Sequence, residues 1–304
     1  MPGIINLNLN GSTSNLGAGF DALGLAVELP LRVTCHIDGS KSGIISAHGE
    51  GANEIAIRED NLIAKAFHHA CMKINRNAPR FALEIDNRIP LKRGLGSSGA
   101  AIVAGLLAAN AYFDHALSQQ QLLDLACGLE GHPENASASL LGGLTVNGVE
   151  NGGVICARFA PPANWVAACF VPDLEIATEE ARRVLPSSLA RHEAVSNLQS
   201  TAMMVAAFAQ KKPELLRFAT RDAIHQPYRK KLIPGYDDIT GAALHAGAFC
   251  AFLSGSGSTM LAICEVTRSA QIAAAMQAEA RAGNLAGRPM ILPFASRAAE
   301  VSIA

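Results

Sequence analysis

Residues 90–110, PLKRGLGSSGAAIVAGLLAAN, place a glycine–serine cluster directly before a run of small apolar residues that favours a buried helix. Gly94 and Gly96 allow backbone conformations that other residues avoid. Ser97 and Ser98 suit the N-cap of the helix. The bare N–H groups and positive dipole end of a helix start attract anions, above all phosphate. Residues 90–98, called the glycine–serine loop below, are therefore predicted to bind a phosphate group.

Length, charge and hydropathy exclude several classes of protein. The 304 residues are 49% hydrophobic and carry a formal net charge of −1. A nucleic-acid-binding protein would normally carry a basic excess, so no nucleic-acid partner is expected. The apolar run after Ser98 is too short to span a membrane, and the N-terminus lacks the regions of a signal peptide. We expect a cytoplasmic protein without a membrane partner.

The seven cysteines are scattered and form no C-x-x-C pair. An odd set without metal-ligand spacing fits reduced thiols in a cytosolic protein better than a disulfide framework or a zinc site. The composition changes near residues 161–165, PPANW. We therefore expect two domains, residues 1–160 and 161–304, as the length also favours. The second has the pattern of an α+β unit of the split βαβ kind.

The apolar periodicity gives a coarse prediction of the elements. Residues 5–10, INLNLN, alternate as a half-buried strand does, and residues 11–21, GSTSNLGAGFD, are interpreted as a glycine-rich loop. Helices are predicted over 61–74, over 117–131 with Ser118 as cap, and over 178–186, where Thr178 suits the cap. Further predictions are a strand over 165–173, a long helix over 192–209, a strand–glycine loop–strand over 247–266 and a helix over 269–283.

The glycine–serine loop allows other interpretations. Residues 94–99, GLGSSG, satisfy the dinucleotide-binding pattern G-x-G-x-x-G. That fold needs a strand running straight into the glycines and an acidic residue about 20 positions later, at the end of a second strand. Here residues 89–93 intervene and the downstream region is helical. A Walker A loop and the protein-kinase motifs are absent from the sequence. A plain turn before a core helix remains the alternative.

Five motifs in order resemble those of the GHMP kinase family. The phosphate signature P-x-x-x-G-L-G-S-S is matched from Pro90 to Ser98. The loop S-A-N-L-G-P-G-F-D-A-L-G is matched over residues 14–24 and E-G-H-P-D-N over residues 130–135. The remaining matches are T-x-x-A-R at 178–182, together with H-Q-P-Y-R at 225–229 and the final motif, LSGSGST, at 253–259. The resemblance covers nearly the whole chain. It implies an α+β fold of two domains, one ribosomal-S5-like and the other ferredoxin-like.

The resemblance implies that the protein uses ATP with Mg²⁺. The implied nucleotide-binding residues are Asn61, Pro90, Leu91, Lys92, Arg93, Gly94, Leu95, Gly96, Ser97, Ser98, Gly99 and Ala100. Ser98 and Glu130 are the implied ligands of Mg²⁺, which prefers oxygen donors. A solvated-loop role for Lys92 and Arg93, a helix cap for Asn61 and a surface carboxylate for Glu130 are the alternatives.

Within the family the motifs are most similar to those of members that phosphorylate L-homoserine on the way to threonine. The resemblance implies that Asp21 pairs with the ammonium group of this acceptor. Arg182 and Arg229 would bind its carboxylate, since a guanidinium group matches a carboxylate with two parallel hydrogen bonds. A surface ion pair is the alternative for either arginine. The implied pocket is completed by Asn15, His132, Asn135 and Thr178, and the implied catalytic set is Asn15, Asp21, Asn135 and Arg182. No general base is assigned.

Several residues depart from the family pattern. Glu134 replaces the usual aspartate, and Gly128 stands where many relatives carry a second acidic residue, which leaves the magnesium ligands open. A kinase for another small alcohol, such as threonine or mevalonate, is one alternative, although mevalonate has no ammonium group for Asp21. A metabolite-binding protein without catalysis is another, and the intact Ser98 and Glu130 argue against it. A homodimer is among the assemblies that we expect.

Overall fold

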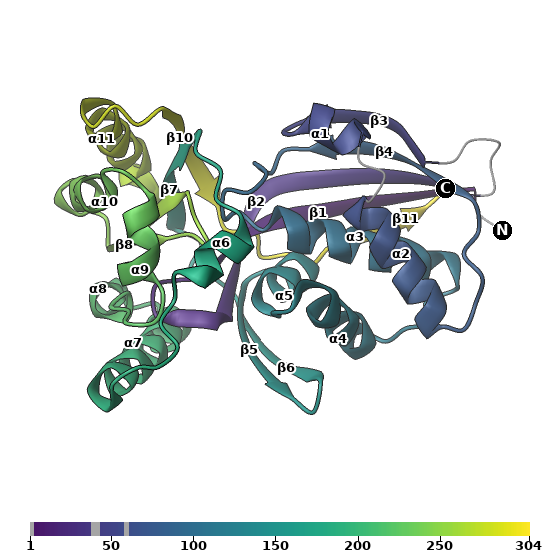
Figure 1. Ribbon diagram of the computed structural model, residues 1–304, viewed down its shortest axis with the longest axis horizontal. Coiled ribbons are helices and arrows are strands. Elements are labelled where there is room, and N and C mark those ends of the chain that lie inside the picture. Colours follow the sequence, from purple (N-terminus) through teal and green to yellow (C-terminus); the bar gives the residue numbers. More distant parts are fainter. Residues whose placement is uncertain (1–2, 38–42, 58–60) are drawn as a thin grey trace.

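The computed structural model describes residues 3–37, 43–57 and 61–304, which form two lobes side by side (Figure 1). One lobe is built on a seven-stranded sheet and the other on a four-stranded sheet. Helices cover both sheets, which confirms the predicted α+β class. None of the helices in the described part of the chain is both long and apolar enough to cross a membrane. All seven cysteines are free thiols.

A long hairpin of β1 (Ile4–Asn15) and β2 (Gly19–Ile37) forms the middle of the first sheet. In β1, buried Ile5, Leu7 and Leu9 alternate with more exposed neighbours, as expected of a strand that covers a core with one face. The strand order is β11-β1-β2-β4-β3, and β5 pairs with the first part of β2 and with β6. These strands are β3 (Gly43–Gly49), β4 (Phe81–Asn87), β5 (Leu144–Glu150), β6 (Gly153–Phe159) and β11 (Glu300–Ile303).

The predicted helix after the glycine–serine loop is α3 (Ser97–Tyr112), and it lies within the helical layer on this sheet (Figure 1). It is buried on nearly every side, which explains why the segment has no polar face. Gly105 lies so close to the neighbouring helix α2 (Leu62–Lys73) that a Cβ on Gly105 would clash with the carbonyl oxygen of Ile63. The other helices of this lobe are α1 (Ala52–Ile57), α2 (Leu62–Lys73), α4 (Gln119–Glu130) and α5 (Glu134–Leu141).

The second sheet has the strand order β10-β7-β9-β8, and every pair in it is antiparallel. With the helices between β7 and β8 and between β9 and β10, this is the expected ferredoxin-like, split βαβ arrangement. In β7, Trp165 packs against Phe208 of α7, with ring centres 5.3 Å apart, whereas Val166 and Ala168 belong to the core cluster that includes residues of α10 and α11. The strands are β7 (Trp165–Pro172), β8 (Cys250–Leu253), β9 (Met260–Glu265) and β10 (Gly287–Pro293). The helices are α6 (Thr178–Arg183), α7 (Arg191–Gln210), α8 (Leu216–Ala219), α9 (Gln226–Arg229), α10 (Tyr236–His245) and α11 (Ser269–Ala282).

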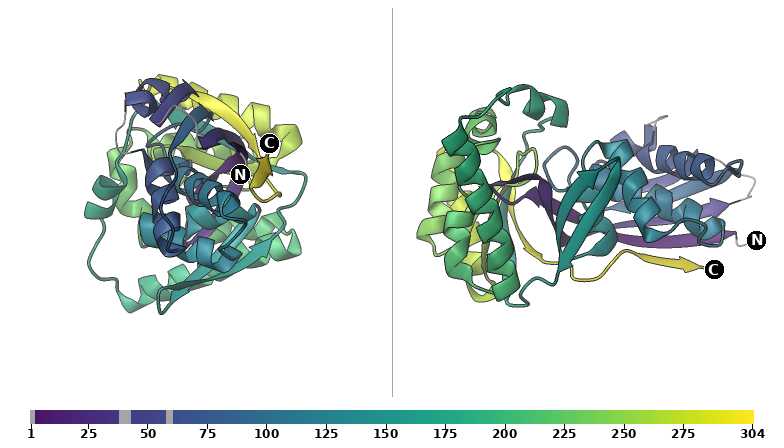
Figure 2. Two further views of the ribbon diagram at one scale, coloured as in Figure 1. Left: turned by 90° about the vertical axis from the view of Figure 1, so that its right-hand side faces the viewer. Right: turned by 90° about the horizontal axis from the view of Figure 1, so that it is seen from below.

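The tip of the β1–β2 hairpin reaches into the second lobe (Figure 2). A Cβ on Gly17 would lie 2.6 Å from the Cα atom of Thr220. The carbonyl oxygen of Ala18 accepts hydrogen bonds from Asn197 Nδ2 (2.6 Å) and Thr201 Oγ1 (2.8 Å). The prediction of a loop over residues 11–21 was therefore wrong for most of its length. The strands continue to Asn15 and resume at Gly19, because their polar side chains find partners inside the protein.

Two predicted caps were also wrong. The N-cap of α3 is Gly96, in a left-handed conformation with φ 74°, and Ser97 is already the first helical residue. The N-cap of α6 is Ala177 and not Thr178. By contrast, Ser118 caps α4 as predicted: its hydroxyl group accepts from the Gln121 N–H group. The structure adds the reciprocal bond of a capping box.

The expected domain boundary between residues 160 and 161 falls in the connection from β6 to β7. The later range nevertheless contributes β11 to the first sheet, where it pairs with β1. The boundary stays a prediction.

The close contact between α3 and α2 leads to a test of stability. We expect Gly105→Ala to lower the free energy of unfolding by about 1–3 kcal/mol, because the added methyl group meets the backbone of α2. Gly128→Ala, in the exposed part of α4 with open space around it, is the matched control and should raise stability by about 0.5–1 kcal/mol. Urea denaturation of both variants gives the two values. Equal effects of the same sign would contradict the packing described here.

Candidate active site

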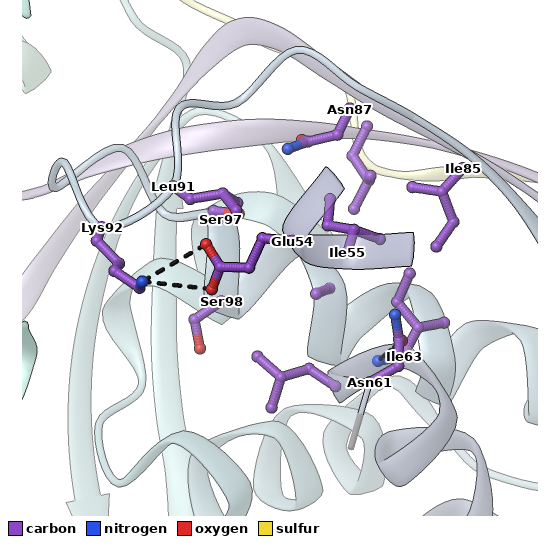
Figure 3. A pocket seen from close by; sticks show the side chains of 13 residues that line it. Glu54, Ile55, Asn61, Ile63, Ile85, Asn87, Leu91, Lys92, Ser97 and Ser98 are labelled. Atoms are coloured by element: carbon purple, nitrogen blue, oxygen red, sulfur yellow. Dashed lines mark hydrogen bonds and ion pairs between the residues drawn. The ribbon is translucent and has the colours of Figure 1, made fainter. Parts of the chain in front are cut away.

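Two pockets adjoin the glycine–serine loop, and Lys92, Ser97 and Ser98 line both. The first, called the apolar pocket, lies between α1, the start of α2 and the sheet (Figure 3). Its walls are Leu31, Glu54, Ile55, Asn61, Leu62, Ile63, Ile85, Asn87, Leu91 and Ala101. The second, called the polar pocket, takes charged side chains from both lobes. An apolar and a charged compartment therefore share the loop between them.

The N-cap position of α3 carries no side chain. Gly96 occupies it, a Cβ there would clash with Ser12 Oγ, and within the described residues the first turn has no side-chain cap. Ser97 and Ser98, both in this turn, line the two pockets. The helix start therefore keeps its N–H groups available for an anion.

The glycine–serine loop, strand β1 and the connection between β8 and β9 meet through hydrogen bonds. Ser254 Oγ lies 2.6 Å from the Gly94 carbonyl oxygen and 2.8 Å from Thr13 Oγ1 of β1. The N–H group of Gly255 donates to the Ser14 carbonyl oxygen (3.1 Å). A Cβ on Gly94 would clash with the backbone of Ser254. A glycine is needed at position 94 because the loop touches the β8–β9 connection backbone to backbone.

Lys92 and Arg93 connect the loop to both lobes. Lys92 Nζ pairs with Glu54 of α1 (3.3 Å, Figure 3) and with Glu175 (3.3 Å). Hydrogen bonds to Glu175 and Glu54 raise the pKa of Lys92. Arg93 Nε donates to the carbonyl oxygen of Pro172 at the end of β7 (2.8 Å). Both side chains thus hold the loop in place, and the expected attraction of a nucleotide stays a prediction.

Glu130 places a carboxylate group beside the start of α3. Gly99 leaves room for it, since a Cβ there would lie 2.9 Å from Glu130 Oε2. This oxygen is buried and has no hydrogen-bond partner within the described residues. Burial raises the pKa of Glu130 to about 7; the charge of His132 acts against this shift, and the charge of Glu134 adds to it. A divalent cation would supply the missing partner, so Ser98 and Glu130 fit the expected Mg²⁺.

Asp21 and Arg182 form an ion pair in the polar pocket. Arg182 Nη2 donates to Asp21 Oδ1 (2.8 Å) and Nη1 donates to Oδ2 (3.0 Å), so the pair is bidentate. Burial lowers the pKa of Arg182, but the hydrogen bond and charge of Asp21 outweigh it and raise that pKa. The side chains are 37% (Arg182) and 33% (Asp21) exposed, and both line the pocket. The alternative of an ion pair for Arg182 is thus observed, with the expected ammonium-binding residue as its partner.

Arg229 reaches the same pocket from α9 and is almost completely buried, at 2% exposure. Its Nη1 donates to the Gly255 carbonyl oxygen (3.1 Å). The guanidinium groups of Arg229 and Arg182 lie 5.2 Å and 5.4 Å from the ring centre of Phe20. Burial and the charge of Arg182 lower the pKa of Arg229 to about 10, so it stays charged at neutral pH. Both guanidinium groups can therefore make a cation–π interaction with the ring of Phe20, which favours two like charges at neighbouring positions.

His225 supports Arg229 from inside the second lobe. Its Nε2 lies 2.7 Å from the Gly17 carbonyl oxygen and must donate to it, which leaves Nδ1 as the acceptor facing Arg229 Nη1 at 3.5 Å. Burial lowers the pKa of His225 to about 4; Asp222 opposes this shift and Arg229 adds to it. The imidazole is therefore neutral and links the hairpin tip to the arginine.

Two amide side chains tie the pocket walls together. Asn15 Nδ2 donates to the Gly255 carbonyl oxygen (3.0 Å), and its Oδ1 accepts from the N–H group of Asp21 (3.1 Å). Asn135 Nδ2 donates to Glu134 Oε1 (2.9 Å), and its Oδ1 accepts from Ser12 Oγ (3.0 Å). These bonds fix the backbone that carries Asp21 and the segment that carries Glu134.

An anionic corner of the polar pocket surrounds His132. Its Nδ1 lies 3.0 Å from Glu134 Oε1. Burial lowers the pKa of His132, but Glu134, Glu130 and Asp21 outweigh burial and raise it. Glu134 is itself 2% exposed, and its Oε2 has no hydrogen-bond partner in the described part of the chain.

The structure brings most of the predicted site residues together. The polar pocket is lined by Asn15, Asp21, Glu130, His132, Asn135, Thr178, Arg182 and Arg229, with Pro90 and Lys92 to Ser98 of the loop. Leu91 and Asn61 line the apolar pocket, and Asn61 also caps α2 through its Oδ1 atom. Gly99 and Ala100 line neither pocket. The roles of all these residues in binding ligands stay predictions.

Four further residues line the polar pocket without having been assigned to it, namely Ser14, Glu134, Gly255 and Ser256. Gly255 and Ser256 lie in the LSGSGST motif, which was quoted without a role. The repeated glycine–serine pattern singled out Gly255 and Ser256. The sequence did not show that they lie beside the glycine–serine loop of residues 90–98.

The depressed pKa of His225 predicts a dependence of stability on pH. Below the ordinary value of 6.5 the unfolded chain binds a proton at this residue, whereas the folded chain does so only near pH 4. The stabilising effect of neutral His225 is therefore complete above pH 6.5 and is lost as the pH falls toward 4. We expect the stability difference between wild type and His225→Gln, measured by urea denaturation, to shrink over this window. A constant difference would show that His225 does not titrate in this way.

Comparison with known proteins places the chain in a family. The family models for the GHMP kinases N terminal domain and the GHMP kinases C terminal match residues 61–143 and 203–282. A homoserine kinase of Microchaete diplosiphon is 40% identical over 273 residues, which cover 90% of this chain and 89% of the relative. One of Desulfitobacterium hafniense is 37% identical over 298 residues, 98% of this chain and 100% of the relative.

A crystal structure of homoserine kinase from Cytophaga hutchinsonii has the same fold, with a TM-score of 0.88 and 26% sequence identity. The match covers 99% of this chain and 98% of that one. Sequence and fold thus agree over both lobes, and this confirms the predicted two-domain architecture. The chain belongs to the GHMP kinase family, in the group of the homoserine kinases.

Proposed function

We propose that the protein transfers the γ-phosphoryl group of ATP to the side-chain hydroxyl group of L-homoserine. The products are ADP and O-phospho-L-homoserine, an intermediate in threonine biosynthesis. The observation that carries the proposal is the placement of Asp21, Arg182 and Arg229 in one pocket beside the glycine–serine loop. An anionic group next to two guanidinium groups complements an amino-acid zwitterion. The 40% sequence identity with a homoserine kinase over nine tenths of the chain supports L-homoserine as the acceptor.

On the donor side, the adenine base would occupy the apolar pocket beside Asn61. The triphosphate would then cross the loop to the first turn of α3, where the N–H groups are not capped. Ser98 and Glu130 would hold Mg²⁺, which when bound neutralises charge on the phosphate oxygens. The unpartnered Glu130 Oε2 is the observation that supports this assignment.

On the acceptor side, Asp21 would hold the ammonium group, and Arg182 with Arg229 the carboxylate group. The hydroxyl oxygen would attack the γ-phosphorus, the bond from phosphorus to the leaving ADP oxygen would break, and the hydroxyl proton would pass to water. Catalysis would rest on alignment and charge neutralisation, to which Asn15 and Asn135 contribute by fixing the pocket walls. No side chain is assigned as general base.

Release of ADP at fixed MgATP tests the proposal, with L-homoserine, D-homoserine, L-threonine and mevalonate as parallel acceptors. We expect strong turnover with L-homoserine alone, since the pocket offers partners for both charges of the L-amino acid. Turnover with another alcohol would contradict the assignment of the acceptor. Binding of ATP without turnover of any of the four would favour a protein that senses a metabolite.

The magnesium assignment makes a separate prediction. Ser98→Ala should raise the Mg²⁺ concentration needed for half-maximal activity by roughly 10-fold or more and lower kcat, because one oxygen donor is lost. Ser97→Ala is the matched control: it removes a hydroxyl group from the same turn and should leave the Mg²⁺ titration in place. Identical Mg²⁺ titration curves for Ser98→Ala and wild type would show that Ser98 is not a ligand of Mg²⁺.

A further inference from the structure

The Asp21–Arg182 ion pair occupies the groups that the proposed acceptor needs. Both carboxylate oxygens of Asp21 accept from Arg182, and both terminal nitrogens of Arg182 are used in doing so. The two residues come from different lobes, Asp21 from β2 and Arg182 from α6. The pair therefore presents one negative and one positive group to each other across the pocket in which a zwitterion would bind.

The surroundings keep the two charges in place. The backbone N–H group of Asp21 is held by Asn15 Oδ1, and the guanidinium group of Arg182 lies over the ring of Phe20. Arg229 adds a second, buried positive charge next to the first. About a third of each paired side chain is exposed, so an incoming ligand can reach both partners.

We propose that this ion pair is an internal substitute for the acceptor and selects for ligands that carry both charges. The ammonium group of the acceptor would take the place of Arg182 at Asp21, and its carboxylate would take the place of Asp21 at Arg182. Every charged hydrogen bond that opens is then replaced by another. The inference rests on the proposed function, because it assumes that L-homoserine binds in this pocket.

A ligand with one charge cannot complete this exchange. An amine without a carboxylate would pair with Asp21 but would leave Arg182 without a partner, and a hydroxy acid without an ammonium group would do the reverse. A charged group that loses its partner on binding costs affinity, and recognition sites reject incomplete ligands by this means. The specificity would then reside in the pair itself as well as in the contacts of each residue.

Two ligands and two variants test the exchange. 3-Aminopropan-1-ol is L-homoserine without its carboxylate, and 4-hydroxybutanoate is L-homoserine without its ammonium group. Dissociation constants are measured by ligand-observed NMR in the presence of Mg²⁺ and a non-hydrolysable ATP analogue, so that no turnover is needed. The variants are Arg182→Gln and Asp21→Asn, each of which removes one charge and keeps a polar side chain.

We expect a crossed result. Arg182→Gln should bind 3-aminopropan-1-ol roughly 3-fold or more tighter than the wild type does, because Asp21 no longer has a competing partner, a gain of the size expected for a partly exposed ion pair. Asp21→Asn should bind 4-hydroxybutanoate more tightly for the corresponding reason. Both variants should bind L-homoserine more weakly. Arg183→Gln, one residue further along α6 and exposed, is the control and should change none of these constants.

Equal or weaker binding of the single-charge ligands by both variants would overturn the exchange. This outcome is distinguishable from failure of the proposed function. If the wild type binds and phosphorylates L-homoserine but the crossed gains are absent, only the exchange is wrong. If the wild type does not bind L-homoserine, the acceptor assignment itself is wrong.

Discussion

The backbone contact between Gly94 and the β8–β9 connection is the constraint on which the rest of the site depends. The Gly94 carbonyl oxygen meets Ser254 Oγ, and there is no room for a Cβ at Gly94. The same connection bonds to β1 through Gly255 and to α9 through Arg229. The glycine–serine loop, the hairpin tip and the second lobe are thus held at one place, and any ligand that touches one of them lies close to the others.

This arrangement explains how the two compartments are linked. The loop between them is held by Lys92 and Arg93, whose partners lie on α1 and at the end of β7. Gly99, which has no side chain, leaves room for the Glu130 carboxylate at the start of α3. The acceptor charges sit on the other side, on the strand and helix that the hairpin tip brings together. A phosphoryl donor and a zwitterionic acceptor would therefore meet beside Ser98 and Glu130.

Much of this could be predicted from the sequence, and the exceptions have a common physical cause. The α3 helix, the capped start of α4 and the second sheet follow from local patterns of apolar and capping residues. The strand character of residues 11–15 does not, because Ser12 and Thr13 are satisfied by partners far along the chain. The Asp21–Arg182 pair joins residues 161 positions apart. Motifs indicated a ligand for each of these two side chains, but only the fold shows that they meet.

A crystal structure with Mg²⁺, a non-hydrolysable ATP analogue and L-homoserine would test the central claim most directly, which is that donor and acceptor meet across the glycine–serine loop. We predict the base in the apolar pocket, the triphosphate over the first turn of α3 and L-homoserine in the polar pocket. The ammonium group should contact Asp21, the carboxylate should contact Arg182, and the bidentate bonds between these two residues should be open. L-homoserine bound outside the polar pocket, or a nucleotide that avoids the loop, would contradict it.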